Sequence, residues 1–210
     1  MSFGDDVRLR SMLVEGVAPW VWPKEDIGAW EGPKQDWKYI KEAINTFVKK
    51  FDVVVQAGGN CGMYPRFLSD MFETVYTFEP DPLNFHCLVN NCQKSNIIKI
   101  NAALGETNKL LSVVPLNHQN VGMHKVSEEG VRTIPTFTLD QLALTKCDFI
   151  LLDCEGYEPN VILGAMETIT IFKPVIIVET YTDEIGQLLS PLGYSIKGTI
   201  DNFDKILAVD

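Results

Sequence analysis

From residue 51 onward, short runs of β-branched and other apolar residues alternate with segments that favour helix. The apolar runs occupy residues 53–55, 75–78, 97–100, 149–152 and 175–178. Because they are apolar almost throughout, they are typical of strands that are covered on both faces. Strands separated by helices form right-handed βαβ units. The pattern therefore predicts an α/β protein with a single doubly wound, mostly parallel sheet.

The segments between the runs carry recognisable helix starts and one hairpin. Asp81 directly before Pro82 predicts an N-cap with proline in the first turn. Thr and Gln at the ends of residues 138–141 predict a capping box. Residues 194–200 and 205–209 flank a polar turn and predict a terminal antiparallel hairpin.

The charge of the chain excludes some classes of partner. The 210 residues include 18 basic and 28 acidic side chains, a net charge of −10. Nucleic acid is therefore an unlikely partner, because sequence-independent binding to its phosphates needs Lys and Arg in excess. No apolar run approaches the length of a membrane span, and the N-terminus lacks the apolar segment of a secretory signal. We expect no membrane association.

The cysteines indicate a reducing compartment. Their number is five, and no C-x-x-C motif occurs. An odd count without such spacing disfavours both a disulfide framework and a tetrahedral zinc site. Free thiols fit the cytoplasm, so we expect a cytoplasmic protein and assign no metal ligands.

Residues 1–50 differ in composition from the rest of the chain. They hold all four tryptophans, and their charges balance, so the acidic excess lies in residues 51–210. Apolar residues at helical spacing predict one helix over residues 34–50, and the part before it is expected to be irregular or short-helical. Trp37 is expected in the core. Trp20 and Trp22 either pack as core or form an aromatic lid over a ligand. We therefore predict an N-terminal helical or irregular cover over residues 1–50 and an α/β domain over residues 51–210.

A polar side chain directly follows or ends each of the five apolar runs. These side chains are Gln56, Glu79, Asn101, Asp153 and Glu179. In an open parallel sheet the carboxyl ends of the strands meet at one edge, and ligands bind there. The five residues therefore predict a polar binding site at that edge.

The first run leads into a glycine-rich turn at residues 58–62. Glycines let the backbone approach a ligand closely, and a following helix N-terminus favours negative charge. The turn is no G-x-G-x-x-G motif, which would need Gly at positions 60 and 63, and no P-loop either. Glu79 follows at the end of the second run, where a carboxylate can accept two hydrogen bonds from a ribose diol. Two acceptor oxygens suit a 2′-phosphate badly, which tells against NADP.

Three acidic residues, Asp153, Glu155 and Glu158, alternate with other residues after the fourth run. Carboxylates at a strand end can orient a substrate hydroxyl, act as a base or hold a metal. They can also stabilise the start of a helix through its dipole. We expect Asp153 to face inward, and Glu158 to belong to the helix start.

Several of these stretches, in this order, resemble the FkbM-type S-adenosylmethionine-dependent methyltransferases of the class I Rossmann-like fold. The resembling stretches are residues 55–64, 75–85, 101–105, 138–140, 149–158 and 173–179. Together they span about residues 51–180, so the first 50 residues lie outside the resemblance.

The resemblance implies S-adenosyl-L-methionine as the cofactor and gives roles to the matching positions. The implied cofactor-binding residues are Gln56, Gly58, Gly59, Asn60, Gly62, Glu79, Pro80, Asn101, Ala102 and Asp153. The glycine-rich turn would run alongside the methionine part of the cofactor. Glu79 would hold the ribose diol. The adenine would be bordered by Pro80, Asn101 and Ala102. Asp153 would face the methyl-transfer site. The sequence departs from the family at Gln56, where Asp is usual, and Gln brings no countercharge for the cofactor's ammonium.

The resemblance further implies methyl transfer to a hydroxyl of a small molecule or glycan. The acceptor must be aligned with the S–CH3 bond, and a hydroxyl must lose its proton. The candidate bases are Asp153, Glu155, Glu179, His118 and His124. The two histidines fall in a polar loop, residues 117–124, which either binds the acceptor or is merely solvated.

Two other functions stay open at this point. Because Gln56 replaces the usual Asp, one alternative is a non-catalytic module that binds S-adenosylmethionine without turnover. A nicotinamide-dependent oxidoreductase has less support, because its usual glycine motif is missing.

Overall fold

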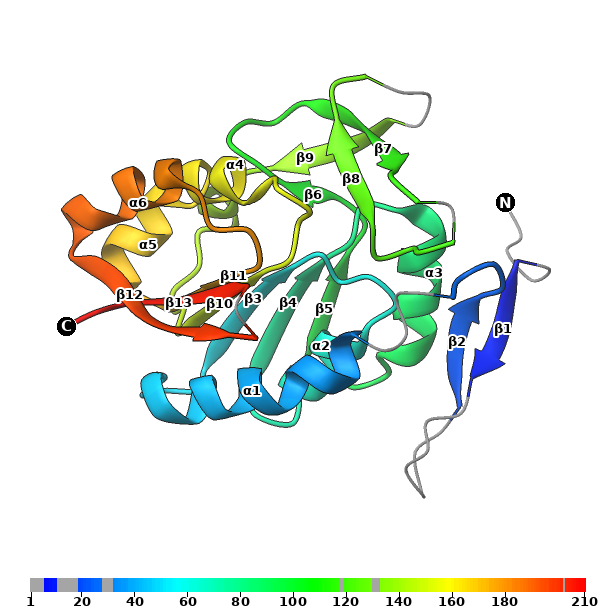
Figure 1. Ribbon diagram of the computed structural model, residues 1–210, viewed down its shortest axis with the longest axis horizontal. Helices are drawn as coiled ribbons and strands as arrows, with labels where there is room; N and C mark the ends of the chain where they lie inside the picture. Colours follow the sequence, from blue (N-terminus) through cyan, green and yellow to red (C-terminus); the bar gives the residue numbers. More distant parts are fainter. Residues whose placement is uncertain (1–5, 11–18, 28–31, 118, 130–132, 202) are drawn as a thin grey trace.

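A seven-stranded sheet forms the centre of the computed structural model, which describes residues 6–10, 19–27, 32–117, 119–129, 133–201 and 203–210. The strand order is β12-β13-β11-β10-β3-β4-β5 (Figure 1). The parallel strands are β3 (Val53–Ala57), β4 (Thr74–Phe78), β5 (Ile97–Ile100), β10 (Phe149–Leu152) and β11 (Val175–Val178). Each contains one of the five predicted runs, so the predicted parallel sheet is confirmed.

The C-terminal hairpin completes this sheet. β12 (Tyr194–Ile200) and β13 (Asp204–Val209) pair antiparallel, as the turn between them predicts. β13 also pairs antiparallel with β11, so it lies between β11 and β12. Only the end of the sheet therefore departs from parallel pairing.

Helices cover both faces of the sheet, and alternate strand residues point to opposite faces. Val54 and Phe149 pack on the side of α1, α2 and α3, whereas Val55 and Ile150 pack on the side of α4, α5 and α6. The bounds are α1 (Gly32–Phe47), α2 (Met63–Leu68), α3 (Pro82–Asn91), α4 (Glu158–Leu163), α5 (Met166–Phe172) and α6 (Asp183–Leu189). Figure 1 shows α1 below the sheet and α4 to α6 above it. Burial on both faces explains why the strands are apolar throughout.

The helix predicted over residues 34–50 forms as α1. Its residues Ile40, Ala43 and Ile44 are buried and belong to the same hydrophobic core as the sheet. Part of the N-terminal segment therefore belongs to the helical layer on one face of the sheet. The domain division at residue 50 stays a prediction.

Two predicted helix caps have different outcomes. Asp81 caps α3 as predicted, since its Oδ1 accepts hydrogen bonds from the backbone N–H groups of Leu83 (2.8 Å) and Asn84 (3.1 Å). The capping box at residues 138–141 is wrong: the segment is a short 3-10 helix, η1 (Leu139–Leu142), without a side-chain cap. Asp140 within it instead accepts hydrogen bonds from α5.

A second, small sheet lies between β5 and β10 in the chain and was not predicted. Its order is β6-β9-β7-β8, with β6 (Ala103–Leu104), β7 (Leu110–Pro115), β8 (His124–Ser127) and β9 (Thr133–Phe137). His124 is therefore the first residue of a strand. Figure 1 shows this sheet beside the carboxyl ends of the parallel strands. β7, β8 and β9 are partly exposed and carry polar residues or proline among the apolar ones, so none of these three strands is a run that is apolar throughout.

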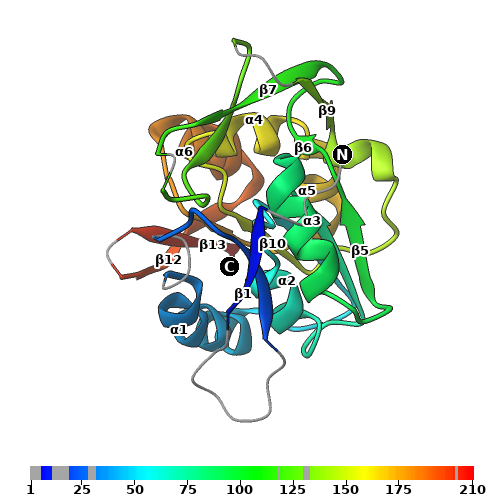
Figure 2. The ribbon, with the colours of Figure 1, turned by 90° about the vertical axis from the view of Figure 1, so that its right-hand side faces the viewer.

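The tryptophan-rich segment forms a hairpin of β1 (Val7–Arg10) and β2 (Trp20–Pro23) instead of irregular or short-helical structure. Figure 2 shows this hairpin beside α3, against which β2 packs. Trp20 and Trp22 are 0% and 1% exposed and pack against Cys61 and Met63. They are core residues, so the aromatic-lid interpretation is wrong. Trp37 packs against the main core, as expected.

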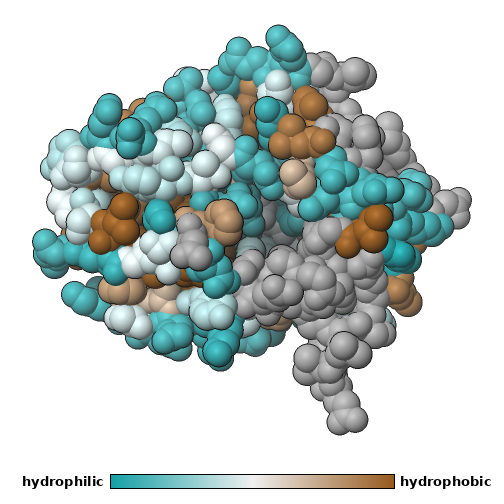
Figure 3. All heavy atoms as spheres, viewed as in Figure 1, coloured by the Kyte–Doolittle hydropathy of each residue, from teal (hydrophilic) through white to brown (hydrophobic). Residues whose placement is uncertain are grey.

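Among the helices that the structure describes, none is both long and apolar enough to cross a bilayer. The face in Figure 3 is largely hydrophilic, with hydrophobic side chains in separate places.

The contact of α1 with the sheet can be tested by removing one buried side chain. Ile44 is 0% exposed, and an Ile→Ala change at such a site costs about 2–5 kcal/mol of stability through lost burial and a cavity. We expect Ile44→Ala to lower the urea midpoint accordingly. Lys41→Ala, on the exposed side of α1, is the control and should have little effect. An equally small effect of Ile44→Ala would contradict the packing of α1 on the sheet.

Candidate active site

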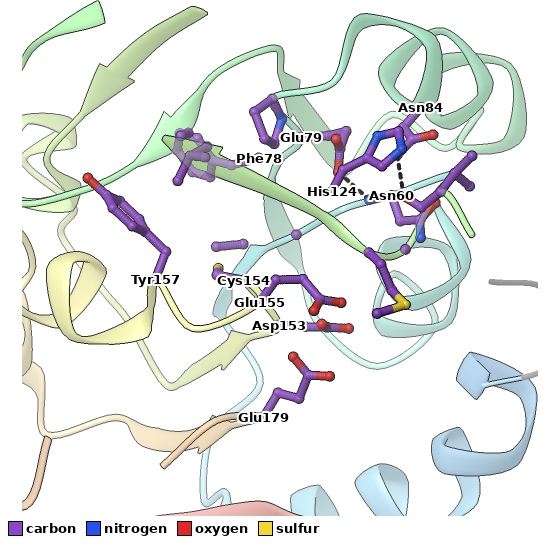
Figure 4. Close-up of a pocket in the computed structure, with 18 of the residues that line it drawn as sticks. Asn60, Phe78, Glu79, Asn84, His124, Asp153, Cys154, Glu155, Tyr157 and Glu179 are labelled. Carbon is purple, nitrogen blue, oxygen red and sulfur yellow. Dashed lines mark hydrogen bonds between the residues drawn. The ribbon is translucent and has the colours of Figure 1, made fainter. Parts of the chain in front are cut away.

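A pocket of about 220 Å³ opens at the carboxyl ends of β3, β4, β10 and β11 (Figure 4). Gly58 and Asn60 line it from the turn after β3, and Glu79 and Pro80 from the end of β4. The opposite part is lined from the ends of β10 and β11, and β6, β8 and the loop before β8 close it. The polar edge predicted from the strand ends is therefore a real cavity.

The absence of a side chain at Gly58 lets two strand ends meet. A Cβ built on Gly58 would lie 1.8 Å from the backbone oxygen of Asp153, and its φ is +84°. Any other residue would therefore clash, quite apart from the strain of a left-handed backbone. The turn after β3 and the end of β10 are thus in direct contact in the floor of the pocket.

Glu79 is a buried carboxylate held by two backbone N–H groups. Its Oε2 accepts from Asn60 (2.6 Å), and its Oε1 accepts from Asp81 (2.7 Å). Burial raises the pKa of Glu79 to about 8, although these hydrogen bonds lower it. Each carboxylate oxygen keeps a second lone pair for a ligand. Glu79 is thus oriented by the protein and still able to accept hydroxyl donors.

Three more carboxylates, Asp153, Glu155 and Glu179, converge on the other side of the pocket. One oxygen from each lies within 4.8 Å of the others, and Figure 4 shows the three side chains pointing toward one another. Burial, and then the charge of Glu179, raises the pKa of Glu155 to about 7 and that of Asp153 well above its usual range. This cluster can therefore exchange protons near neutral pH. Its spacing would also suit a divalent cation.

His124 lies on the Glu79 side of the pocket in Figure 4 and is paired with the cap of α3. Its Nδ1 lies 3.2 Å from Oδ2 of Asp81. Burial opposes ionisation of Asp81, but hydrogen bonds from His124 and the start of α3 hold the pKa of Asp81 below its usual value. Because the carboxylate is ionised, the Nδ1–H of His124 must donate. His118, the other predicted histidine, lies outside the described residues.

Gln56 lies outside the pocket, although it stands at the family's acidic position. It is 0% exposed, its Oε1 accepts from the Thr77 hydroxyl (2.6 Å), and its Nε2 donates to the backbone oxygen of Gly58 (2.7 Å). Gln56 thus joins β3 and β4 and holds the glycine-rich turn from behind.

Four other predicted residues support the pocket without lining it. An added Cβ would lie 2.5 Å from α3 at Gly59 and 2.7 Å from a Cys92 sulfur at Gly62, so both glycines allow close packing of the turn. The Nδ2 of Asn101 donates to the backbone oxygen of Glu79 (2.8 Å). Ala102 is fully buried. The structure thus places Gly58, Asn60, Glu79, Pro80, His124, Asp153 and Glu155 together around the cavity, but not these four or Gln56.

Asn84 and Tyr157 line the pocket but were not predicted from the sequence, whereas residues 120–123 belong to the polar loop that was considered for acceptor binding. Asn84 lies one turn into α3, and its position beside a predicted cap could have suggested it. Tyr157 lies within the acidic segment, and its hydroxyl is buried without a partner among the described residues.

The sheet order and the pocket at the strand ends define a class I methyltransferase fold. The FkbM methyltransferase structure from Methylobacillus flagellatus KT superposes with a TM-score of 0.52 at 23% identity, over 74% of this chain. The chain spans 42% of the length of that structure. A Streptococcus mutans protein in complex with SAH superposes with a TM-score of 0.50 at 10% identity, over 82% of this chain and 95% of that one.

Sequence comparison gives the family. The Methyltransferase FkbM domain matches residues 56–196. The hexuronic acid methyltransferase AglP of Haloferax volcanii is 30% identical over 163 residues, which cover 73% of this chain and 68% of that protein. The chain belongs to the FkbM family of S-adenosylmethionine-dependent methyltransferases.

The raised pKa of Glu155 has a consequence for stability. The folded protein binds this proton more tightly than the unfolded chain, so the contribution of Glu155 is favourable at low pH. It is lost as the pH rises from the unfolded pKa, near 4.5, through about 7. We expect Glu155→Gln to raise the melting temperature at pH 8, by about 2–4 °C for each kcal/mol relieved, and less at pH 5.

The measurement is thermal unfolding of both proteins at pH 5 and pH 8. Glu128→Gln is the matched control, because Lys109 lowers the pKa of that exposed carboxylate. It should give no gain at pH 8. A loss of stability in Glu155→Gln at pH 8 would contradict the repulsion within the cluster.

Proposed function

We propose that this enzyme transfers a methyl group from S-adenosylmethionine to a hydroxyl of a sugar, free or within a glycan. The observation that carries the proposal is the single pocket that joins Glu79 to the Asp153, Glu155 and Glu179 cluster. The Glu79 end of the pocket suits a nucleoside, and the end with the carboxylate cluster can accept a proton. The sugar acceptor is supported by the relative named hexuronic acid methyltransferase.

The residues at the Glu79 end fit the cofactor. Both Glu79 oxygens are oriented by backbone N–H groups and keep lone pairs, as a vicinal ribose diol requires. The open space above Gly58 leaves room for the methionine portion, and the carboxylate cluster has the opposite charge to a sulfonium. When bound, the cofactor supplies an electrophilic methyl group. Gln56 adds no countercharge there, so the carboxylates at the strand ends carry the electrostatic attraction.

The cluster end provides the base. A hydroxyl becomes a better nucleophile as it loses its proton, and a carboxylate with a pKa near the working pH accepts it well. Glu155, with its pKa of about 7, is the first candidate. Asp153 and Glu179 lie beside it, with one oxygen of each within 4.8 Å. His124 donates through Nδ1 to Asp81, which leaves its Nε2 lone pair able to accept a proton, but it lies on the Glu79 side of the pocket and is therefore the second candidate.

A second hollow, of about 230 Å³, adjoins the cluster and suits the acceptor ring. Glu179 lines both cavities, and Asp201, Phe203 and Asp204 come from the β12–β13 turn. Phe203 is 74% exposed. An exposed aromatic ring beside carboxylates offers a sugar both an apolar face and hydrogen-bond acceptors.

The two alternative functions named from the sequence predict different experimental results. Membership of a methyltransferase family leaves the nicotinamide-dependent oxidoreductase without support. A non-catalytic module would bind S-adenosylmethionine but transfer no methyl group to any sugar in an acceptor panel. Turnover on a neutral hexoside or a hexuronic acid would exclude that alternative.

The ribose assignment predicts the behaviour of Glu79→Ala. Above pH 8, where Glu79 is ionised, loss of this charged acceptor should weaken binding of S-adenosylhomocysteine at least about tenfold, since hydrogen bonds to charged groups contribute about 1.5–3 kcal/mol. Isothermal titration calorimetry measures this directly. Glu73→Ala, an exposed carboxylate just before β4, is the control. Unchanged affinity in a folded Glu79→Ala protein would overturn the assignment.

The base assignment predicts a pH dependence. The turnover rate should rise as the pH passes about 7, where Glu155 loses its proton, and then level off. In Glu155→Gln the rate should fall about 10²–10⁴-fold, the usual contribution of a general base. The measurement is the turnover rate with saturating acceptor between pH 5.5 and 9, with exposed Glu129→Gln as control. A wild-type profile that is flat over this range would contradict the assignment.

A further inference from the structure

One wall of the cofactor pocket is a loop without regular structure. Residues 119–123, called the wall loop below, lie just before β8, and Asn120, Val121, Gly122 and Met123 from it line the cavity. Figures 1 and 2 both show the segment between β7 and β8 reaching toward the N-terminal hairpin. The shape of the pocket therefore depends on whatever holds this loop.

The backbone of Val121 is bound from two sides. On the pocket side, the Nδ2 of Asn84 donates to the carbonyl oxygen of Val121 (2.9 Å). On the other side, the N–H of Val121 donates to Oδ1 of Asp26 (3.1 Å). The N–H of Ile27 also donates to the carbonyl oxygen of Gln119 (2.8 Å). The wall loop thus lies between α3 and the end of the N-terminal hairpin.

Asp26 is itself rigidly placed. It is 0% exposed, and its Oδ2 accepts from the indole N–H of Trp22 (2.7 Å). Its backbone oxygen accepts from the guanidinium of Arg8 (2.5 Å). A buried carboxylate is stable only when its oxygens are satisfied, and here the second oxygen is satisfied by the wall loop.

The hairpin is anchored to the elements that carry the cofactor residues. Asn91 of α3 exchanges two hydrogen bonds of 2.8 Å with the backbone of Val21. The same Nδ2 donates to the carbonyl oxygen of Cys61 (2.7 Å), in the glycine-rich turn. Val121 packs with Trp20 and Trp22 in one buried cluster. The hairpin, the turn and the wall loop are therefore one connected unit.

We propose that Asp26 is a positioning residue for cofactor binding: it holds the wall loop in its binding shape through the N–H of Val121. The inference rests on the assignment of this pocket to S-adenosylmethionine. A loop that is already ordered loses less conformational freedom when the cofactor binds, so affinity is higher. The N-terminal hairpin, which lies outside the family match at residues 56–196, then forms a working part of the site.

The test compares the affinity for S-adenosylhomocysteine of the full-length wild type and Asp26→Ala, well below the melting temperature of each. We expect the dissociation constant to rise at least about tenfold in Asp26→Ala, with faster hydrogen exchange in the peptide that covers the wall loop. Glu25→Gln, an exposed neighbour, should change neither. Ile44→Ala, which lowers stability at α1, should also leave the affinity unchanged. An unaltered dissociation constant in folded Asp26→Ala, or an equal rise in Ile44→Ala, would overturn the proposal.

Asp26→Asn keeps the shape of the side chain and gives a second readout. Its single oxygen can serve Val121 or Trp22 but not both, so we expect an affinity between wild type and Asp26→Ala. Adding Trp22→Phe removes the competing donor and should bring the affinity back toward wild type. A further loss in the double variant would overturn the proposal. A wild type that does not bind S-adenosylhomocysteine would instead refute the cofactor assignment, so the two failures are distinguishable.

Discussion

The site depends on the close approach of Gly58 to the backbone of Asp153. β3 and β10 are neighbours in the centre of the sheet, where the strand order changes direction, and their ends lie side by side. A side chain at position 58 would occupy the space of the Asp153 carbonyl. Without one, the turn beside Glu79 meets the strand end that carries the carboxylate cluster. The nucleoside end and the proton-accepting end of the proposed site are thereby held in one cavity.

The acidic side chains around this contact have two opposing effects. These partly buried carboxylates are poorly solvated and repel one another, which raises the pKa of Asp153 and Glu155 and weakens folding at high pH. In the proposed function, the same crowding attracts a sulfonium and tunes a base to neutral pH. Stability and catalysis thus make opposite demands on the same residues, and the hydrophobic layers on both faces of the sheet supply the stability.

Much of the fold and part of the site could be predicted from the sequence. The five apolar runs, the Asp81 cap and the terminal hairpin follow from local rules of burial and backbone sterics, and the structure confirms them. Glu79, Asp153 and Glu155 line the cavity because strand ends of a parallel sheet meet at one edge. The small sheet and the contacts that hold the wall loop were not predicted, since they depend on pairings between distant residues that no local pattern records.

The sequence by itself determined the parallel sheet, its polar edge and the family, because apolar periodicity and motif order are local properties of the chain. Only the tertiary structure decided the direction of individual side chains. Gln56 bonds to Thr77 and Gly58 behind the turn because alternate residues of β3 face opposite layers. Trp20 and Trp22 are core rather than lid because the hairpin docks on α3. Those outcomes depend on which surfaces meet, and that is a property of the folded chain.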